Sequence, residues 1–288
     1  MDKITVAAPA KINLFLEVHG KKDDGYHNIE SLMQTVSLFD TLEIERTDGE
    51  TTLTCADEKL PCGPSNLIIK AASAFFAGTE LTGGASFRLT KIIPVAAGLG
   101  GGSTNAAATL IGLNKLYQTN FTVKQLCAIG SALGADVPFC VRRGTCYASG
   151  IGEMLKRCPD IPDCHIVVAI GNGRISTRWA FHRIDDMLER RIAGIDDMRS
   201  AIDQSNIEDI AANLYNTFEA VSPYEIKIKH ILLESGALGA TMSGSGPAIF
   251  GIFGDADKAS AAHDTLTAVG YKSFICRPIA KQDAGDRI

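Results

Sequence analysis

The chain has 288 residues, of which 45% are hydrophobic and 21% are charged, and its formal net charge is −5 at pH 7. These values are ordinary for a soluble globular protein, and the length is sufficient for two domains or lobes. The sequence has no long basic block, so its charge pattern gives no support for binding nucleic acid or a membrane surface. It also lacks an apolar run of the ~18 residues that span a membrane and the long apolar segment of a signal peptide.

The cysteines and histidines indicate a reduced protein without a structural metal site. None of the eight cysteines forms a C-x-x-C motif, and the six histidines form no H-E-x-x-H motif. At this density in a long chain, the cysteines are expected to be reduced and mostly buried. We therefore expect a cytoplasmic protein.

The first strands are predicted from a weak alternation of apolar residues. Strands are expected from Ile4, over Ile12–Val18 after an interruption at Pro9, and over Thr41–Arg46. Asp48-Gly49 then predicts a β-hairpin, because these two residue types favour the type I′ turn.

Two helices are predicted from their capping residues. Asn66 precedes a helix that stops at Gly78. Thr122 and Gln125 form the capping box of a helix that ends near Gly134.

The pattern restarts after an expected linker at Pro159–Asp163. A hairpin is expected before the linker, at 145–155. Strands are expected after the linker at 165–170, 239–242, 248–253 and 271–279. Helices are expected there at 179–191, 206–220, 223–234 and 256–268. Runs in this order predict an α+β fold in two lobes, 1–158 and 159–288, and they leave open which lobe the last strand joins.

The stretch from Pro94 to Ala108, P-V-A-A-G-L-G-G-G-S-T-N-A-A-A, connects a strand expected at 87–93 to a helix that runs to about Tyr117. Glycine lets the backbone adopt positive φ angles and approach a ligand closely. The free N–H groups and the dipole of the first helical turn then favour an anion. A flexible turn is the alternative, but four glycines joined directly to a Ser-Thr-Asn cap favour a phosphate site.

Two familiar phosphate loops are excluded. A Walker A loop requires a lysine after its glycines, and none is present. A dinucleotide-binding loop requires G-x-G-x-x-G, but the third glycine position is Ser103 when counted from Gly98 and Asn105 when counted from Gly100. The stretch is therefore a third kind of phosphate loop.

Three further segments carry polar residues suited to phosphoryl transfer. Lys11 and Asn13 share one face of a strand, and a lysine in an apolar segment needs a counter-charge or a ligand. Asp136 lies among small and apolar residues after a helix, and the turn M-S-G-S-G-P at 242–247 joins two strands. The alternatives are, respectively, a lysine that reaches solvent, a loop cap and an ordinary hairpin.

In this order, P-A-K-I-N, P-x-x-x-G-L-G-G-G-S-T-N-A-A, L-G-A-D-V-P and G-S-G-P resemble the motifs of the GHMP kinases, a family that includes galactokinase, homoserine kinase and mevalonate kinase. The resemblance covers residues 9 to about 253. It implies an N-terminal ribosomal-protein-S5-like lobe that binds ATP and a C-terminal ferredoxin-like lobe that binds the substrate. N-L-I-x-K-A at 66–71 and D-G-Y-H at 24–27 resemble the members that act on a methylerythritol linked to cytidine diphosphate, in isoprenoid precursor biosynthesis. One departure is Val95-Ala96-Ala97, where those members are expected to have another glycine.

The resemblance implies that ATP lies along the glycine loop, with its adenine near Asn66 and Lys91. The cofactor-binding residues implied are Asn66, Lys91, Pro94, Val95, Ala96, Ala97, Gly98, Leu99, Gly100, Gly101, Gly102, Ser103 and Thr104. Mg²⁺ is expected to accompany ATP within reach of Ser103 or Thr104, and its ligands are left open.

The resemblance also implies the catalytic residues. Asp136 is expected to accept the proton of the substrate's 2-hydroxyl, and Lys11 to hold Asp136 and the hydroxyl in place.

The resemblance also implies five residues that bind the substrate. Asn13 is expected near Lys11, and Tyr26 and Phe181 on the two faces of the cytosine, with His27 at its edge and Thr177 nearby. A surface turn is the alternative for Tyr26 and His27, and a core position is the alternative for Phe181.

Two other functions are kept as alternatives. The first is a GHMP kinase for homoserine or a mevalonate-like alcohol, although such a substrate needs no pair of aromatic residues to stack on a base. The second is a non-catalytic nucleotide-binding protein on the same fold, which need not keep both Lys11 and Asp136. The expected partners are small molecules, with no nucleic acid and no membrane, and the protein is expected to be a monomer or weak homodimer.

Overall fold

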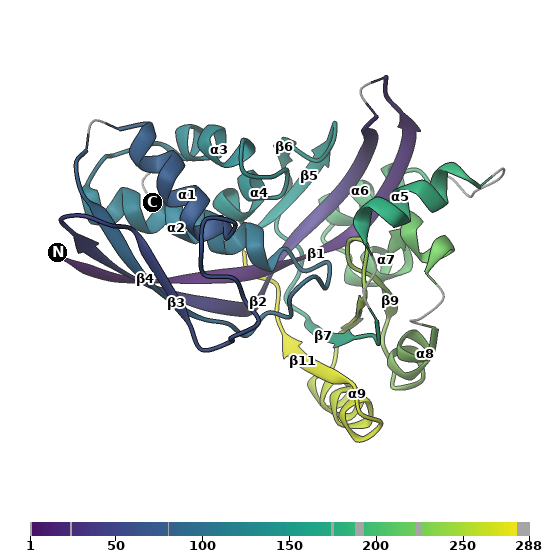
Figure 1. Cartoon of the computed structure of the whole chain (residues 1–288). Helices are drawn as coiled ribbons and strands as arrows, with labels where there is room; N and C mark the ends of the chain where they lie inside the picture. The colour runs from purple at the N-terminus through teal and green to yellow at the C-terminus, as the bar shows by residue number, and fades with distance from the viewer. Residues whose placement is uncertain are drawn as a thin grey trace.

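Two long strands, β1 (Lys3–Lys21) and β2 (His27–Thr47), run through the molecule. They pair in antiparallel orientation along most of their lengths and extend from the N-terminal lobe at the left of Figure 1 to its upper right. The computed structural model describes residues 2–23, 25–79, 81–173, 176–187, 193–222 and 226–280. Within those ranges, no helix combines the length and the apolar character needed to cross a membrane.

The sequence predicted that Pro9 interrupts the first strand, and this prediction is wrong. Pro9 lies within β1, at a shift of register. Pro9 is paired with Phe39 and Lys11 with Thr35, so β2 uses more residues than β1 across this point. A proline cannot donate a hydrogen bond to the neighbouring strand, and an irregular position of this kind tolerates that loss.

β1 and β2 are the centre of a seven-stranded sheet. Its main path has the order β3-β4-β2-β1-β8, while β5 pairs with β2 and β6 pairs with β5. The other strands are β3 (Thr52–Cys55), β4 (Gly84–Thr90), β5 (Thr145–Ser149), β6 (Met154–Arg157) and β8 (Tyr215–Asn216). β5 and β6 form the hairpin predicted at 145–155.

The hairpin predicted at Asp48-Gly49 is wrong. The chain reverses there, but β3 pairs in parallel with β4, which lies between β2 and β3. A turn sequence determines the reversal of the chain and not its pairing partner. Phe87 and Leu89 on β4 are buried, so β4 supplies the apolar face that the inner position requires.

Four helices lie over one side of this sheet in Figure 1: α1 (Leu67–Ala77), α2 (Gly101–Tyr117), α3 (Val123–Ser131) and α4 (Val137–Arg142). Asn66 caps α1, and Thr122 and Gln125 form the capping box of α3, as predicted. The short helix α4 was not predicted, although Pro138 near its start is a residue that a first helical turn tolerates.

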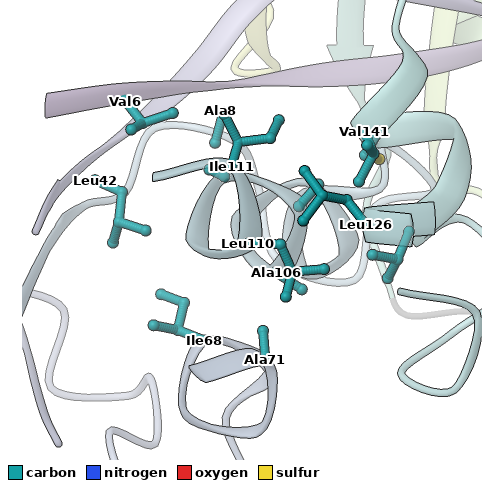
Figure 2. Packing of buried hydrophobic residues seen from close by; sticks show 14 of the residues in the cluster. Val6, Ala8, Leu42, Ile68, Ala71, Ala106, Leu110, Ile111, Leu126 and Val141 are labelled. Atoms are coloured by element: carbon teal, nitrogen blue, oxygen red, sulfur yellow. The ribbon is translucent and has the colours of Figure 1, made fainter. Parts of the chain in front are cut away.

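The helix that follows the glycine loop, α2, is enclosed on every side. All its side chains from Thr104 to Asn114 are buried, which is typical of a helix inside a core. Figure 2 shows α2 packed between the sheet and α1, with side chains of α3 and α4 nearby, through Val6, Ala8, Leu42, Ile68, Ala71, Ala106, Leu110, Ile111, Leu126 and Val141. The start of α2 is therefore held in rigid surroundings.

A second, four-stranded antiparallel sheet has the order β11-β7-β10-β9. One of its faces packs against helices through Leu232 and Leu266, and the other packs against β1 and a further helix through Ile12 and Met198. These elements are β7 (His165–Ile170), β9 (Gly239–Met242), β10 (Ala248–Phe253), β11 (Lys272–Cys276), α6 (Asp196–Asp203), α8 (Ile226–Glu234) and α9 (Ala256–Ala268). The predicted α+β fold class is confirmed.

The single helix predicted at 206–220 is wrong. Instead, α7 (Ile207–Ala212) is followed by β8 and by the 3₁₀ helix η1 (Thr217–Val221). Asn216 explains the break, because its side chain donates hydrogen bonds to the carbonyls of Met242 and Gly244. β8 also pairs in parallel with β1.

Two other predicted helices agree with the structure only in part. The helix α5 (Thr177–Asp185) is shorter than the prediction of 179–191, whose residues 188–191 lie outside the described residues. The first residues of the prediction at 223–234 also lie outside them, and α8 accounts for the rest. The sequence did not predict α6.

The last described residues connect the two lobes. β11 lies at the edge of the second sheet beside β7, and the chain then crosses to β2. There the Ser37 N–H donates to the Arg277 carbonyl, and the Ile279 N–H donates to the Thr35 carbonyl. The strand predicted at 271–279 is therefore divided between the second sheet and the edge of the first lobe.

Candidate active site

The glycine loop leads from the end of β4 to the start of α2. Gly98 and Gly100 have φ angles of 79° and 68°, in the left-handed region that glycine adopts at little cost. Gly100 is the N-cap of α2, so the unpaired N–H groups of the first turn face the loop. The predicted cap, 103–105, lies inside this first turn instead, and α2 has no side-chain cap hydrogen bond.

Ala96 also has a positive φ angle, of 55°. It lies in the segment where the motif resemblance predicts another glycine. An alanine in this conformation costs about 1–2 kcal/mol. The loop therefore has, at Ala96, a backbone conformation that glycine adopts more easily than alanine.

The turn Ser243–Pro247 of the second lobe packs directly on the glycine loop. Ser243 Oγ donates a hydrogen bond to the Gly98 carbonyl (2.9 Å) and accepts one from the Asn13 N–H (3.3 Å). A Cβ atom on Gly98 would lie 2.0 Å from the Ser243 carbonyl oxygen. The two lobes thus meet at this loop, and only a residue without a side chain fits between them.

Lys11 and Asp136 come together beside the glycine loop. Lys11 Nζ lies 3.5 Å from Asp136 Oδ2, and its aliphatic chain passes close to Gly100. Lys11 is 4% exposed, whereas the side chain of Asp136 is 37% exposed, so the carboxylate is the accessible partner. Asp136 precedes α4 but makes no side-chain hydrogen bond to it, so its side chain does not cap the helix.

The buried side chain of Asn13 connects Lys11 to the second lobe. Its Oδ1 accepts hydrogen bonds from Lys11 Nζ (2.8 Å) and from the Gly244 N–H (3.0 Å). Its Nδ2 donates to Ser31 Oγ (2.9 Å). Asn13 therefore fixes the position of the ammonium group.

Lys91 and Asn66 have protein partners. Lys91 Nζ donates to Asp40 Oδ2 (2.8 Å) and to the Ile93 carbonyl, and Asp40 is fully buried. Asn66 caps α1 and donates to the Pro61 carbonyl (2.7 Å). These contacts hold the segments that flank the glycine loop, and a contact of either side chain with adenine stays a prediction.

Two adjoining cavities open at this site. The first, of about 240 Å³, is lined by the glycine loop, the Ser243–Pro247 turn and the side chains of Lys11, Asn13 and Asp136. The second, of about 710 Å³, is lined by Lys21, Tyr26, His27, Arg178, His182 and Asp185 among others. Both include Ile29, Thr177 and Phe181 in their walls, so an elongated molecule can extend from one into the other.

His27 and Phe181 are in contact in the wall of the second cavity. Their ring centroids lie 4.7 Å apart at an interplanar angle of 16°, and Phe181 meets Phe218 edge-on. Tyr26 is 60% exposed and lines the same cavity. Phe181 both lines the cavity and packs against the apolar core of the second lobe, so the two interpretations made from the sequence are compatible.

Asp185, at the end of α5, anchors His27. His27 Nε2 lies 2.6 Å from Asp185 Oδ1, and Lys21 Nζ lies 3.0 Å from Asp185 Oδ2. The hydrogen bond with His27 lowers the pKa of Asp185 below its ordinary value, so this carboxyl group is ionised at neutral pH. At the other end of α5, Thr177 Oγ1 forms a hydrogen bond of 2.8 Å with Ser245 Oγ.

Cys140 lies one helical turn after Asp136 and is buried. Burial raises the pKa of its thiol to about 12, and the charge of Asp136 adds to this effect. The thiol is therefore protonated at neutral pH and is not a nucleophile.

Several residues that hold the site together were not predicted from the sequence. They act through contacts between distant segments, and they are Ser31, Asp40, Asp185, Phe218, Ser243 and Ser245. Only the two serines of the turn carried a signal, in the segment M-S-G-S-G-P at 242–247. Asp24 of the D-G-Y-H motif lies outside the described residues.

Comparison with known proteins identifies the family. Family models described as GHMP kinases N terminal domain and GHMP kinases C terminal match residues 66–144 and 198–272. A 4-diphosphocytidyl-2-C-methyl-D-erythritol kinase from Syntrophus aciditrophicus is 40% identical over 277 residues, which cover 95% of this chain and 98% of that protein. One from Lachnospira eligens is 38% identical over 275 residues, which cover 94% of this chain and 96% of that protein. The chain belongs to the 4-diphosphocytidyl-2-C-methyl-D-erythritol kinase family.

Solved structures agree with membership of this kinase family. A crystal structure of a 4-(cytidine 5'-diphospho)-2C-methyl-D-erythritol kinase matches with a TM-score of 0.80 at 31% identity, covering 96% of this chain and 99% of that chain. The homoserine kinase from Cytophaga hutchinsonii matches with a TM-score of 0.76 at 19% identity, covering 98% of this chain and 96% of that chain. At this identity, the match shows a similar fold and nothing more. The GHMP kinase fold predicted from the motifs is confirmed.

Proposed function

We propose that this protein is an ATP-dependent kinase that phosphorylates the 2-hydroxyl of 4-diphosphocytidyl-2-C-methyl-D-erythritol, giving the 2-phosphate and ADP, in the non-mevalonate route to isoprenoid precursors. The observation that carries the proposal is the position of the Lys11–Asp136 pair, between the glycine loop and a cavity that continues to His27. The names of the full-length relatives support the same substrate.

In the proposed reaction, the hydroxyl oxygen of the substrate forms a bond to the γ-phosphorus of ATP. The bond from that phosphorus to the bridging oxygen breaks, and its electron pair leaves with ADP. Asp136, whose carboxylate is the accessible member of the pair, takes the hydroxyl proton as general base. Lys11, held by Asn13, orients the carboxylate and the hydroxyl. Phosphoryl transfer requires mainly alignment and charge neutralisation, so a small set of side chains is sufficient.

The phosphates of ATP are assigned to the glycine loop, residues 94–104. The unpaired N–H groups at the start of α2 suit phosphate oxygens. The adenine is assigned to the neighbourhood of Asn66 and Lys91, because both flank the start of α2. A Cβ atom on Gly101 would lie 3.1 Å from Lys91 Nζ, and one on Gly102 would lie 3.2 Å from Leu67, next to Asn66.

Mg²⁺ is assigned to the same end of α2. Thr104 Oγ1 and Asn105 Oδ1 are buried and have no hydrogen-bond partner among the described residues, and oxygen atoms are the ligands that Mg²⁺ prefers. The described part of the chain has no group of three or more His, Cys, Asp or Glu residues that could hold a metal, which fits an ion held mainly by phosphates and water. When bound, the ion neutralises charge on the transferred phosphoryl group. Ser103 or Thr104 is the protein group that we expect to reach it.

The second cavity is assigned to the cytosine. Tyr26 offers an aromatic face, and Phe181, one face of which stacks on His27, lines the same cavity. Each stacking contact with a base contributes about 1–3 kcal/mol. His27 offers a ring nitrogen to the edge of the base. Asn13 and Thr177 line the first cavity, where the methylerythritol end would lie.

We also propose that the protein works in the cytoplasm on small molecules, as a monomer or weak homodimer, without a nucleic-acid or membrane partner. All eight cysteines are free, which is the state typical of a reducing compartment. The net charge of −5 does not favour binding to a polyanion.

The test is the rate of ADP release by the purified protein with ATP, Mg²⁺ and one alcohol at a time. We expect turnover with 4-diphosphocytidyl-2-C-methyl-D-erythritol, a new phosphomonoester signal in the ³¹P NMR spectrum, and no turnover with homoserine or mevalonate. Turnover with one of the last two alcohols alone would overturn the substrate assignment. Binding of ATP without turnover of any alcohol would support the non-catalytic alternative instead.

A further inference from the structure

The helix α5 holds the imidazole of His27 at two points. Phe181 stacks on the face of the ring, with centroids 4.7 Å apart. Asp185 Oδ1 lies 2.6 Å from Nε2 at the edge of the ring. Phe181 and Asp185 are four residues apart, so they occupy the same face of α5 one turn apart. The stacking on Phe181 therefore fixes the plane of the ring, and the contact with Asp185 fixes how the ring is rotated within that plane.

The contact with Asp185 determines which ring nitrogen carries a proton. The carboxylate of Asp185 is ionised and can only accept hydrogen bonds, so Nε2 must be the donor. Lys21, 3.0 Å from the other carboxylate oxygen, already balances the charge of Asp185. In the imidazole tautomer that carries its proton on Nε2, the second nitrogen, Nδ1, is an acceptor.

An acceptor at this position distinguishes cytosine from uracil. Cytosine carries at C4 an amino group, which donates hydrogen bonds, whereas uracil carries there a carbonyl oxygen, which only accepts them. Asp185 occupies Nε2, so Nδ1 is the ring nitrogen left for a base in the cavity that His27 lines. Two acceptors facing each other repel, and a buried pair of this kind is not compensated by water.

We propose that Asp185 is a positioning residue that makes the site select cytosine over uracil, by holding His27 in the tautomer whose Nδ1 accepts a hydrogen bond from the amino group of the base. This inference rests on the proposed function, because it concerns the base of the proposed substrate. It adds a determinant of specificity that lies outside the family motifs and acts through His27.

The test compares kcat/KM for the cytidine diphosphate substrate and for its uridine diphosphate analogue, in the wild-type protein and in Asp185→Asn. The amide has nearly the shape of the carboxylate, but its NH₂ group can donate to Nε2, which moves the ring proton to Nδ1. We expect the preference for the cytidine substrate to fall about 10- to 100-fold. The fall is expected mainly through KM, with kcat nearly unchanged, because Lys11 and Asp136 are not altered.

Asp186→Asn is the matched control, because it makes the same change in the adjacent residue. The carboxylate of Asp186 is 69% exposed and lies 3.6 Å from Arg183, and we expect its replacement to leave the preference unchanged. A long-range ¹H–¹⁵N NMR spectrum of the His27 ring gives a second measurement. It should show the proton on Nε2 in the wild-type protein and on Nδ1 in Asp185→Asn.

Equal losses for the two substrates in Asp185→Asn, with the proton still on Nε2, would show that Asp185 has only a structural role and would overturn the inference. If the wild-type protein turns over neither substrate, the proposed function fails instead. The base preference is then measured from the binding of CDP and UDP by calorimetry. Tighter binding of CDP that is lost in Asp185→Asn would still support the inference, and equal binding of CDP and UDP by the wild-type protein would overturn it.

Discussion

Lys11 and Asp136 differ in their access to the cavity, and this difference suits their proposed roles. A buried ammonium group is costly unless its charge is balanced and its hydrogen bonds are formed. Asn13 and Asp136 both lie within contact distance of Lys11 Nζ, which meets these requirements. Because the carboxylate is the exposed partner, a hydroxyl group can approach it without displacing the lysine.

The proposed base is tested by Asp136→Asn. The amide keeps the size of the side chain but cannot take a proton, so kcat is expected to fall about 10²- to 10⁴-fold while the affinity for ATP stays nearly the same. Steady-state kinetics and calorimetric titration with ATP measure the two effects. Asp196→Asn, at a carboxylate that is 95% exposed, is the control. A wild-type rate in Asp136→Asn would remove this residue from the mechanism.

The assignment of Tyr26 to the cytosine is tested by Tyr26→Ala. Loss of one stacking contact, about 1–3 kcal/mol, is expected to raise KM for the cytidine substrate about 10- to 100-fold. KM for ATP, measured in the same assay, is expected to stay unchanged because the glycine loop is not altered. An unchanged KM for the cytidine substrate would contradict the assignment.

The buried thiols are expected to resist alkylation in the native protein. Burial is the main cause that raises the pKa to about 12 for Cys140, Cys164 and Cys276, and to about 11 for Cys146. At pH 8 a thiol with a pKa of 12 is ionised in roughly one molecule in 10⁴. Mass spectrometry after a short treatment with iodoacetamide should find label first at Cys55 and Cys62, which are half-buried. Early labelling of Cys140 would contradict this expectation.

At the scale of elements, the glycine loop depends on the turn of the second lobe that packs against it. Gly98→Ala would place a methyl group 2.0 Å from the Ser243 carbonyl oxygen, at a φ angle of 79°. We expect a loss of about 1–3 kcal/mol in the free energy of unfolding and an increase of at least about tenfold in KM for ATP. Urea unfolding and kinetics measure these quantities.

Gly254→Ala is the matched control for Gly98→Ala. A Cβ atom there meets only Leu238, at 3.9 Å, so stability and KM for ATP are expected to change little. Similar behaviour of the two variants would show that the contact between loop and turn is not important.

The elements that could be predicted from the sequence are those determined by neighbouring residues. Asn66 caps a helix through the N–H two residues ahead, and Thr122 and Gln125 bond to each other. The break at Asn216 could not be predicted, because its partners are carbonyls 26 and 28 residues away. For the same reason, Asp48-Gly49 indicated a reversal of the chain but not that β4 would lie between the two strands.

The candidate site shows the same division. Lys11 and Asp136 were named from motifs, and the structure brings them to 3.5 Å. Asp185 and Ser243 could not be assigned roles from the sequence, because each acts on a residue more than 140 positions away. Motifs predict which residues take part, while contacts across the chain determine how they are held.

At the scale of the whole molecule, an apolar cluster connects the two lobes. A single cluster contains Ile12 and Leu14 of β1, Leu99 of the glycine loop, and Phe250 and Cys276 of the second sheet. Neither lobe can therefore separate without exposing the apolar surface of the other.

We expect the molecule to unfold in one cooperative transition. Its single tryptophan, Trp179 on α5, reports on the second lobe by fluorescence, and far-UV circular dichroism reports on both lobes. The midpoints of the two urea transitions should coincide. A fluorescence transition at lower urea would show that the second lobe unfolds alone.

The crossing of residues 277–279 to β2 has a consequence for how the protein is made. β1 and β2 are synthesised before residues 277–279, yet the Thr35 carbonyl accepts a hydrogen bond from the Ile279 N–H, and the Ser37 N–H donates one to the Arg277 carbonyl. The apolar side of β1 must also wait for Phe250. A nascent chain interrupted before residue 243 would lack the turn that packs on its glycine loop, so the candidate site forms only after this turn has been synthesised.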